Sequence, residues 1–220
     1  MPVERKTRTA LEVSTSVKRQ FGDESGVQVT DADILRWIND AQYEIVTKNP
    51  EVNPGMVTVN VTAGQTVYPL LTNVPDMLII HSIHFRGQYL NNMPFMEAQQ
   101  QIIRSDDTST DSTPQIWYEY AGTLNLWPIP SVSYNAGLTI FYSKAPTVIT
   151  TMGQTLSVPD SYFKALVDYC LTQAHEMDDN FNSAGVKAQQ FETALQVQAN
   201  RTHSQDAMYP TIQMLPEDYN

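Results

Sequence analysis

The spacing of the apolar residues changes twice along this chain, and this change constrains the fold more than any other feature. A capped helix start at 30–33 leads into an apolar stripe at helical spacing, which ends at Asn49-Pro50. The sequence therefore predicts a helix over 31–48. Short apolar alternations fill residues 51–150, and the helical period returns after Pro159.

The middle of the chain has the pattern of short strands. Apolar residues alternate over 56–61, residues 77–85 are β-branched and apolar, and 116–120 and 123–127 flank the turn residues Ala121-Gly122. Several such strands separated by turn signals predict a small antiparallel β-sandwich or barrel.

The helical stretches on either side can cover one another's apolar faces. The sequence thus predicts an α+β protein, in which a helical bundle carries an inserted β-domain. Its parts are an N-terminal arm and bundle helices (1–50), the β-domain (51–150), the C-terminal bundle helices (151–204) and an extended arm (205–220). The expected bundle core consists of Ile34, Trp37, Ile38, Ala41, Phe163, Leu166 and Cys170.

Charge and composition exclude several classes of protein. The net charge is −11, and no cluster of Lys and Arg interrupts the acidic body, which argues against a protein that grips DNA. A surface past which DNA slides remains compatible with this charge. No apolar run reaches the roughly 20 residues that span a bilayer, and no apolar segment follows the charged N-terminus, so we expect no membrane span and no secretion. The single cysteine fits a reducing cytoplasm.

The last segment of the chain is apolar but has no period. Residues 205–220 are interrupted by Pro210 and Pro216, and such a segment cannot bury itself locally. We expect it to dock along another subunit as an extended arm, and the alternative is that it folds back on its own domain. Residues 1–9, polar and basic, are expected to be flexible or ordered by a partner. The anchors of the docking arm would be Met208, Tyr209, Pro210, Ile212, Met214, Leu215 and Tyr219.

Residues that could carry chemistry have simpler interpretations. His175 has Asp179, not a second histidine, four positions later, and the oxygen-bearing run from Asp178 lacks the glycine and glutamate of a calcium loop. His81 and His84 point to opposite faces of a strand. Cys170 lies on the apolar stripe, and no acid pair stands in a catalytic context. We therefore expect no enzyme, no metal site and no cofactor.

Aromatic residues offer one alternative function. Trp117, Tyr118, Tyr120 and Trp127 could line a carbohydrate site of a binding module, although aromatics at strand spacing are more often core residues and cross-strand pairs.

Three stretches resemble phage head-to-tail adaptor (connector) proteins. Residues 17–42 contain a Gly-Asp turn followed by Ile38-Asn39-Asp40-Ala41, 156–169 are similar to the family's strand-to-helix junction, and 114–130 are similar to its inserted β region. Their order along one chain carries the resemblance.

This resemblance implies a structural virion protein of the head-tail neck, assembled in the host cytoplasm. It implies a homo-oligomeric ring, expected to be a dodecamer, that links the portal protein to the tail nozzle or tail tube and continues the DNA channel. Tail fibres would be a further partner, and genomic DNA would pass without specific binding. It also implies a C-terminal arm that reaches the portal or a neighbouring subunit.

Overall fold

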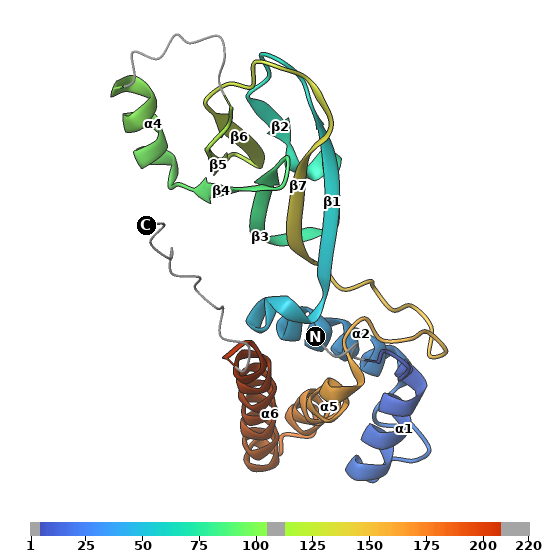
Figure 1. Ribbon diagram of the computed structural model, residues 1–220. Coiled ribbons are helices and arrows are strands. Elements are labelled where there is room, and N and C mark those ends of the chain that lie inside the picture. Colours follow the sequence, from blue (N-terminus) through green and yellow to red (C-terminus); the bar gives the residue numbers. More distant parts are fainter. Residues whose placement is uncertain (1–4, 105–112, 208–220) are drawn as a thin grey trace, which may run out of the picture. The chain divides into compact units, whose positions relative to one another are not determined.

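The computed structural model describes residues 5–104 and 113–207, which fall into two compact units (Figure 1). One unit combines the described residues of Met1–Asn49 and Pro146–Asn220, and the other is the continuous stretch Pro50–Ala145. The first is helical, and the second holds the strands. The fold is therefore mixed α+β, with the β unit between two halves of the helical unit in sequence.

The helical unit is arranged around one central helix. Helix α5 (Phe163–Met177) contacts α1 (Ala10–Phe21), α2 (Asp31–Lys48) and α6 (Phe181–Ala207), and in Figure 1 it lies between α1 and α6. A short 3-10 helix, η2 (Asp160–Tyr162), leads into α5. The bounds of α2 agree with the helix predicted over 31–48.

Local capping explains where the first two helices begin and where α1 ends. Thr9 and Glu12 form a capping box at the start of α1, and the Thr30 side chain accepts the N–H of Asp33 at the start of α2. Gly22 ends α1 in the left-handed conformation, with φ of 90°, which glycine adopts without steric cost.

The apolar stripes of these helices meet in a common core. Ile34, Ile38, Leu166 and Leu171 are fully buried, and each such side chain contributes about 1.5–3 kcal/mol through removal from water. Helix α6 adds its own buried residues, which are Ala184, Phe191 and Leu195.

Helix α6 is longer than the sequence pattern indicated. It begins at Phe181 and continues to Ala207, so 205–207 belong to the helix and not to an extended arm. The reason is local, because no proline or glycine interrupts the chain between Gly185 and Pro210.

The second unit is built on one sheet of seven strands. A 3-10 turn, η1 (Pro50–Val52), precedes the first strand, α3 (Leu70–Asn73) follows β2, and α4 (Phe95–Arg104) follows β4. The strands are β1 (Pro54–Val61), β2 (Val67–Pro69), β3 (Met77–Phe85), β4 (Gln88–Asn92), β5 (Ile116–Tyr120), β6 (Thr123–Trp127) and β7 (Tyr134–Lys144).

The sheet has the order β1-β7-β3-β4-β5-β6-β2, so β1 and β2 are its edges. It curls on itself as a half-barrel (Figure 1), so of the two predicted alternatives, a sandwich or a barrel, it is closer to the barrel. Neighbouring strands are antiparallel except for β4 and β5, which run parallel. Helix α4 stands between β4 and β5 in the sequence, and a parallel pair needs a long crossover connection of this kind.

Strand β4 was not predicted. Its residues, Gln88–Asn92, are mostly polar and only Leu90 is buried, so the alternation that signals a strand is weak. The turn before it, Arg86-Gly87, has positive φ at both positions, 49° and 82°, as a tight two-residue hairpin requires.

The concave side of the sheet holds the core of this unit. Ile83, Leu124, Leu138 and Ile140 are fully buried, and Val57 and Val59 of edge strand β1 pack against them while only partly buried. Among the described residues, no helix combines the length and the apolar character that a membrane crossing requires.

Candidate functional site

The N-terminal segment is fastened to the start of α5 by one carboxylate. The N–H groups of Thr7 and Arg8 donate to Asp160 Oδ1 at 2.9 and 3.0 Å, and the Thr7 hydroxyl donates to Oδ2 at 2.6 Å. These hydrogen bonds, the Thr7 hydroxyl first, lower the pKa of Asp160. Residues 5–9 are therefore ordered by their own chain, which corrects the expectation that 1–9 is flexible or ordered by a partner.

The chain that returns from the β unit is held by two amide side chains of α2. Asn39 donates to the carbonyl of Ile149 at 2.9 Å and accepts its N–H at 2.8 Å, in the manner of a paired strand. One turn further along, Gln42 accepts the N–H of Ser157 at 2.6 Å. The motif Ile38-Asn39-Asp40-Ala41 thus has a physical role, because its apolar members face the core and Asn39 fixes the returning segment.

The Gly-Asp turn between α1 and α2 is organised by Asp23. Its carboxylate accepts the backbone N–H groups of Val27, Gln28 and Val29 and the hydroxyl of Ser25. These donors, with the Val29 N–H contributing most, lower the pKa of Asp23 to about 2. The turn is consequently a fixed connection and not a loose loop.

Ion pairs join the helices to one another. Lys18 and Asp31 lie 2.6 Å apart between α1 and α2, and the almost fully buried Asp168 of α5 pairs with Lys187 of α6 at 3.0 Å. Each pair connects different helices, so the charges belong to the scaffold and are not presented for binding.

The predicted core residues lie where the helices meet. Ile34, Trp37, Ile38, Ala41, Leu166 and Cys170 are buried, whereas Phe163 is half-buried under the Arg8 guanidinium, 4.8 Å from its ring centre. Complete burial raises the pKa of the Cys170 thiol, so the thiolate is disfavoured. The predicted anchors of the docking arm, all within 208–220, lie outside the described residues.

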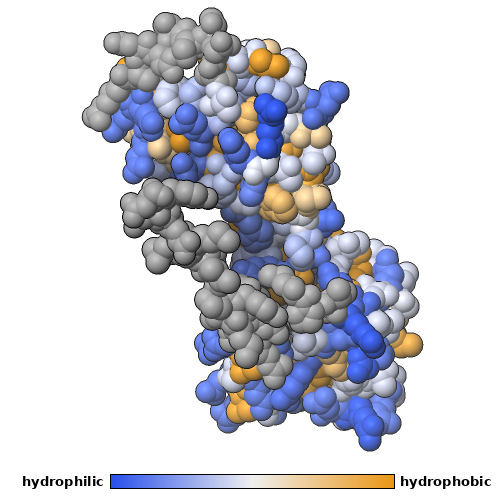
Figure 2. Space-filling view, viewed as in Figure 1, coloured by the Kyte–Doolittle hydropathy of each residue, from blue (hydrophilic) through white to orange (hydrophobic). Residues whose placement is uncertain are grey.

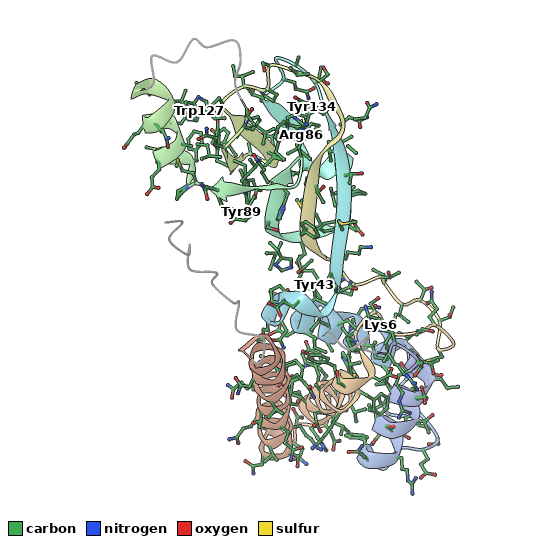
Figure 3. The ribbon with its side chains drawn as sticks, in the orientation of Figure 1. Lys6, Tyr43, Arg86, Tyr89, Trp127 and Tyr134 are labelled. Carbon is green, nitrogen blue, oxygen red and sulfur yellow. The ribbon has the colours of Figure 1, made fainter. Side chains whose placement is uncertain are left out.

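The two tryptophans considered for sugar binding lie in different clusters of the sheet unit. Trp117 is 4% exposed in the core of the sheet, so it cannot stack on a sugar. Trp127 packs beside α4 against the small cluster of Ala98, Ile116 and Tyr118 (Figure 3). Trp127 lies opposite Ile116 and Trp117 lies opposite Leu126 in the β5–β6 ladder, so the two tryptophan rings are not a cross-strand pair and do not form one surface.

The described histidines and acids lie apart from one another. Within residues 5–104 and 113–207, no three His, Cys, Asp or Glu side chains come together closely enough to hold a metal ion. His81 hydrogen-bonds Ser143 at 2.7 Å, His84 packs against Tyr89 and Phe141, and the His175 ring lies 5.3 Å from that of Phe21.

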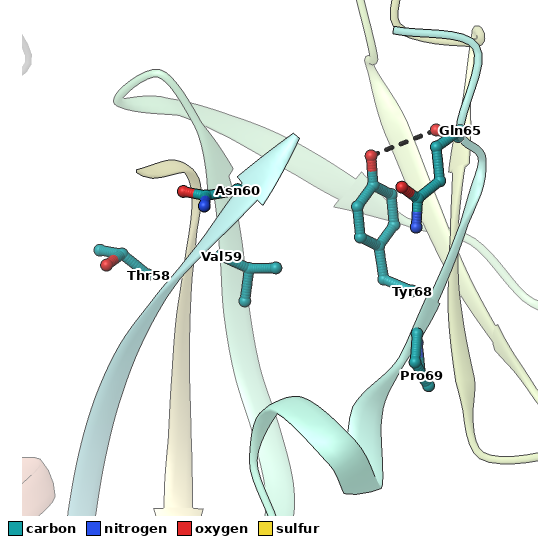
Figure 4. A pocket seen from close by; sticks show the side chains of 6 residues that line it. All are labelled: Thr58, Val59, Asn60, Gln65, Tyr68 and Pro69. Atoms are coloured by element: carbon teal, nitrogen blue, oxygen red, sulfur yellow. Dashed lines mark hydrogen bonds between the residues drawn. The ribbon is translucent and has the colours of Figure 1, made fainter. Parts of the chain in front are cut away.

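Two hollowed surfaces remain as candidates for interaction. One is a groove of about 520 Å³ along α5 and α6. Its lining consists mainly of apolar and amide side chains, and Lys164 is its charged residue. The other lining residues are Ser161, Val186, Gln189, Gln190, Thr193, Ala194, Val197 and Gln198. The other is a pocket of about 460 Å³ between the two edge strands of the sheet (Figure 4). It is lined by Thr58, Val59, Asn60, Gln65, Tyr68 and Pro69.

The exposed apolar side chains are otherwise dispersed. On the face shown in Figure 2, apolar residues alternate with hydrophilic ones over both units. The most exposed lie on turns and helix ends, such as Val27 and Phe181. Sequence reasoning missed the pocket between the edge strands, because it depends on how the sheet curls and not on any local motif.

Comparison with known proteins gives one family match. The model of the family described as SU10 adaptor protein matches residues 8–213. A search of curated proteins gave no match.

Proposed function

The chain belongs to the SU10 adaptor protein family, and from this membership we propose that it is a structural subunit of the ring that joins the portal of a tailed phage to its tail. The match over residues 8–213 is the observation that carries the proposal, and it confirms the resemblance to phage head-to-tail adaptors found in the sequence. In this role the protein is a virion component of the neck, assembled in the host cytoplasm.

We propose that the helical unit acts as a bundle that forms the body of the ring, which is expected to be a dodecamer. Its α5-centred packing and its internal ion pairs support this role, since a ring subunit must keep its shape while neighbours press on it. The portal would bind one face of the ring, and the tail nozzle or tail tube, with tail fibres as a further partner, would bind the other.

The charge of the chain supports a channel that DNA crosses without adhesion. The net charge is −11, and Lys18, Lys48 and Lys187 are engaged in ion pairs with carboxylates of their own chain. Phosphate binding depends on available Lys and Arg, so a surface of this kind repels the duplex and lets it slide.

We further propose that the protein is not an enzyme. Two groups that could act as nucleophiles are sequestered: Cys170 is buried with a raised pKa, and the fully buried Ser143 hydroxyl donates to the carbonyl of Pro50. A structural role requires no accessible nucleophile. In this protein polar side chains instead hold distant segments of the chain together.

Segment 208–220 completes the proposal as an arm that docks on another subunit of the assembly. Its apolar anchors would each contribute about 1.5–3 kcal/mol on burial, which offsets part of the backbone entropy lost, roughly 1–2 kcal/mol per residue.

The test is the mass of the purified protein with and without its portal protein. We expect a ring in the presence of portal, and we expect deletion of 208–220 to abolish portal-bound rings while circular dichroism still reports a folded chain. A full-length protein that remains monomeric beside portal would overturn the proposed function.

A further inference from the structure

Edge strand β1 presents unpaired backbone groups along its outer side. The Lys144 N–H donates to the Asn53 carbonyl at 2.8 Å, and the register continues through Gly55↔Tyr142, Val57↔Ile140 and Val59↔Leu138. Hydrogen-bonded and non-hydrogen-bonded pairs alternate in an antiparallel ladder. The β1 residues that alternate with Gly55, Val57 and Val59 therefore direct their N–H and C=O groups away from β7. The free N–H groups of the edge are therefore those of Met56, Thr58 and Asn60.

The sequence of β1 protects only the two ends of this edge, through Pro54 at the start and a register shift near Val61. Pro54–Val61 contains no charged residue, whereas natural edge strands are usually guarded by charges, by proline within the strand or by shortness. The one irregularity, a register shift between Val59 and Val61, lies at the far end. A long uncharged edge of this kind is a template for another strand.

The opposite edge of the same sheet is protected, which makes the contrast informative. Strand β2 pairs over only three residues, and Pro69 has no N–H to offer. The Gln65 side chain donates to the carbonyl of Val67 at 2.9 Å and so occupies its outward acceptor. One edge of the sheet is closed to pairing and the other is open.

The pocket of about 460 Å³ lies between these two edges, and all six side chains that line it are uncharged (Figure 4). Val57 and Val59 face the inner side of the sheet there and are only partly buried. An occupant of the pocket must be extended to satisfy the β1 edge and uncharged to avoid burying an unpaired charge.

We infer that residues 211–215 of a second copy of this chain occupy the open edge as an added strand. This stretch, Thr-Ile-Gln-Met-Leu, is uncharged, lies between Pro210 and Pro216, and is as long as the free stretch from Met56 to Asn60. In an extended conformation Ile212 and Met214 share one face, which would pack on Val57 and Val59.

This inference rests on the proposed function, because a ring is made from contacts in which one surface of a subunit meets a different surface of the next. An arm seated in the neighbour's sheet is a contact of this kind, and it repeats around a closed ring.

The experiment places one cysteine in each of two copies. Thr58→Cys protein is mixed with Gln213→Cys protein, rings are assembled on portal, and mild oxidation is followed by non-reducing electrophoresis. We expect a disulfide dimer of the two variants. Gln88→Cys mixed with Gln213→Cys is the matched control, since Gln88 is exposed on β4 away from the edge, and it should give none.

Amide exchange supplies a second readout that needs no substitution. Exchange of the peptide that covers β1 should slow by about tenfold or more in full-length rings, compared with protein lacking 208–220. Rings that form but show neither the cross-link nor the slower exchange would overturn this inference and leave the proposed function standing. Failure of any ring to form would overturn both.

Discussion

The helical unit and the sheet unit satisfy their polar groups in different ways. In the helical unit, carboxylates and amides distant in sequence fasten the chain, as Asp160 does for Thr7 and Asn39 does for Ile149. In the sheet unit, the backbone ladder does most of this work, and it stops at β1 with groups left over. The comparison teaches that the helical unit is held together by side-chain contacts between distant parts of the chain, whereas the sheet unit ends in a strand with an unpaired backbone edge.

The distribution of ion pairs sharpens the contrast. Each ion pair between described residues lies in the helical unit, including Lys18–Asp31, Lys48–Glu192 and Asp168–Lys187. Within the described part of Pro50–Ala145 there is none. Charge therefore stabilises contacts between helices, and the sheet relies on pairing and apolar burial.

The largest effect should come from the helical core. Trp37→Ala removes a side chain that is 2% exposed, and the lost burial and the resulting cavity should lower the free energy of unfolding by about 3–5 kcal/mol. Denaturant titration measures this loss, with amide exchange of β3 and β7 reporting on the sheet unit. Tyr43→Ala, on the exposed side of the same helix, is the control and should change stability by less than about 0.5 kcal/mol.

If the two units are separately stable, exchange from β3 and β7 in Trp37→Ala protein should remain as slow as in wild type. An equal loss of protection in both units would show that they unfold as one block, and the comparison between them would lose its basis.

A pair of proline substitutions in β1 tests the assignment of its two sides. Val57→Pro removes an N–H that bonds to β7 and should destabilise the sheet unit by about 1–3 kcal/mol, the usual cost of an unsatisfied buried group. Thr58→Pro removes an N–H that faces outward, so it should cost within about 1 kcal/mol and instead weaken ring assembly. Thermal unfolding and ring mass are measured for both, and equal destabilisation by the two prolines would contradict the register.

Much of the secondary structure could be predicted because its signals are local. The N-cap and apolar stripe of α2, the Ala121-Gly122 hairpin and the β-branched run of β3 each occupy a short window of sequence. The predicted bounds of α2 and β3 agree with the structure. Strand β4 was missed because four of its five residues are exposed, so its place is set by its neighbours β3 and β5.

The connections that matter for function could not be predicted, because their partners are far apart in the chain. Nothing near Thr7 points to Asp160, and nothing near Asn39 points to Ile149. The curl of the sheet, which creates the pocket between β1 and β2, is likewise a property of the whole sheet. The candidate site in the sequence was the arm, whereas the structure adds a surface that could receive it.

A smaller effect, confined to acid pH, should follow from Asp23. Its pKa of about 2 lies below the ordinary value of 3.8, so the folded state favours the ionised carboxylate. Stability from this group is present above about pH 4 and is lost as the pH falls towards 2. Asp23→Asn should be less stable at neutral pH and should lose less stability over that window.

Unfolding free energies measured from pH 7 to pH 2 check this, with Glu24→Gln as the control that removes the neighbouring exposed carboxylate. A wild-type slope in Asp23→Asn protein would show that the turn does not depend on this carboxylate.

The smallest effect should come from the surface pair that joins α2 to α6. Lys48 lies 2.5 Å from Glu192 and 3.0 Å from Glu44, and these hydrogen bonds, Glu192 first, raise the pKa of Lys48. Because these side chains are more than a third exposed, a double-mutant cycle of Lys48→Ala and Glu192→Ala should give a coupling of only about 0.2–1 kcal/mol, reduced further in high salt. A coupling well above this range that persists in salt would mean that ion pairs, and not the buried core, hold the helical unit together.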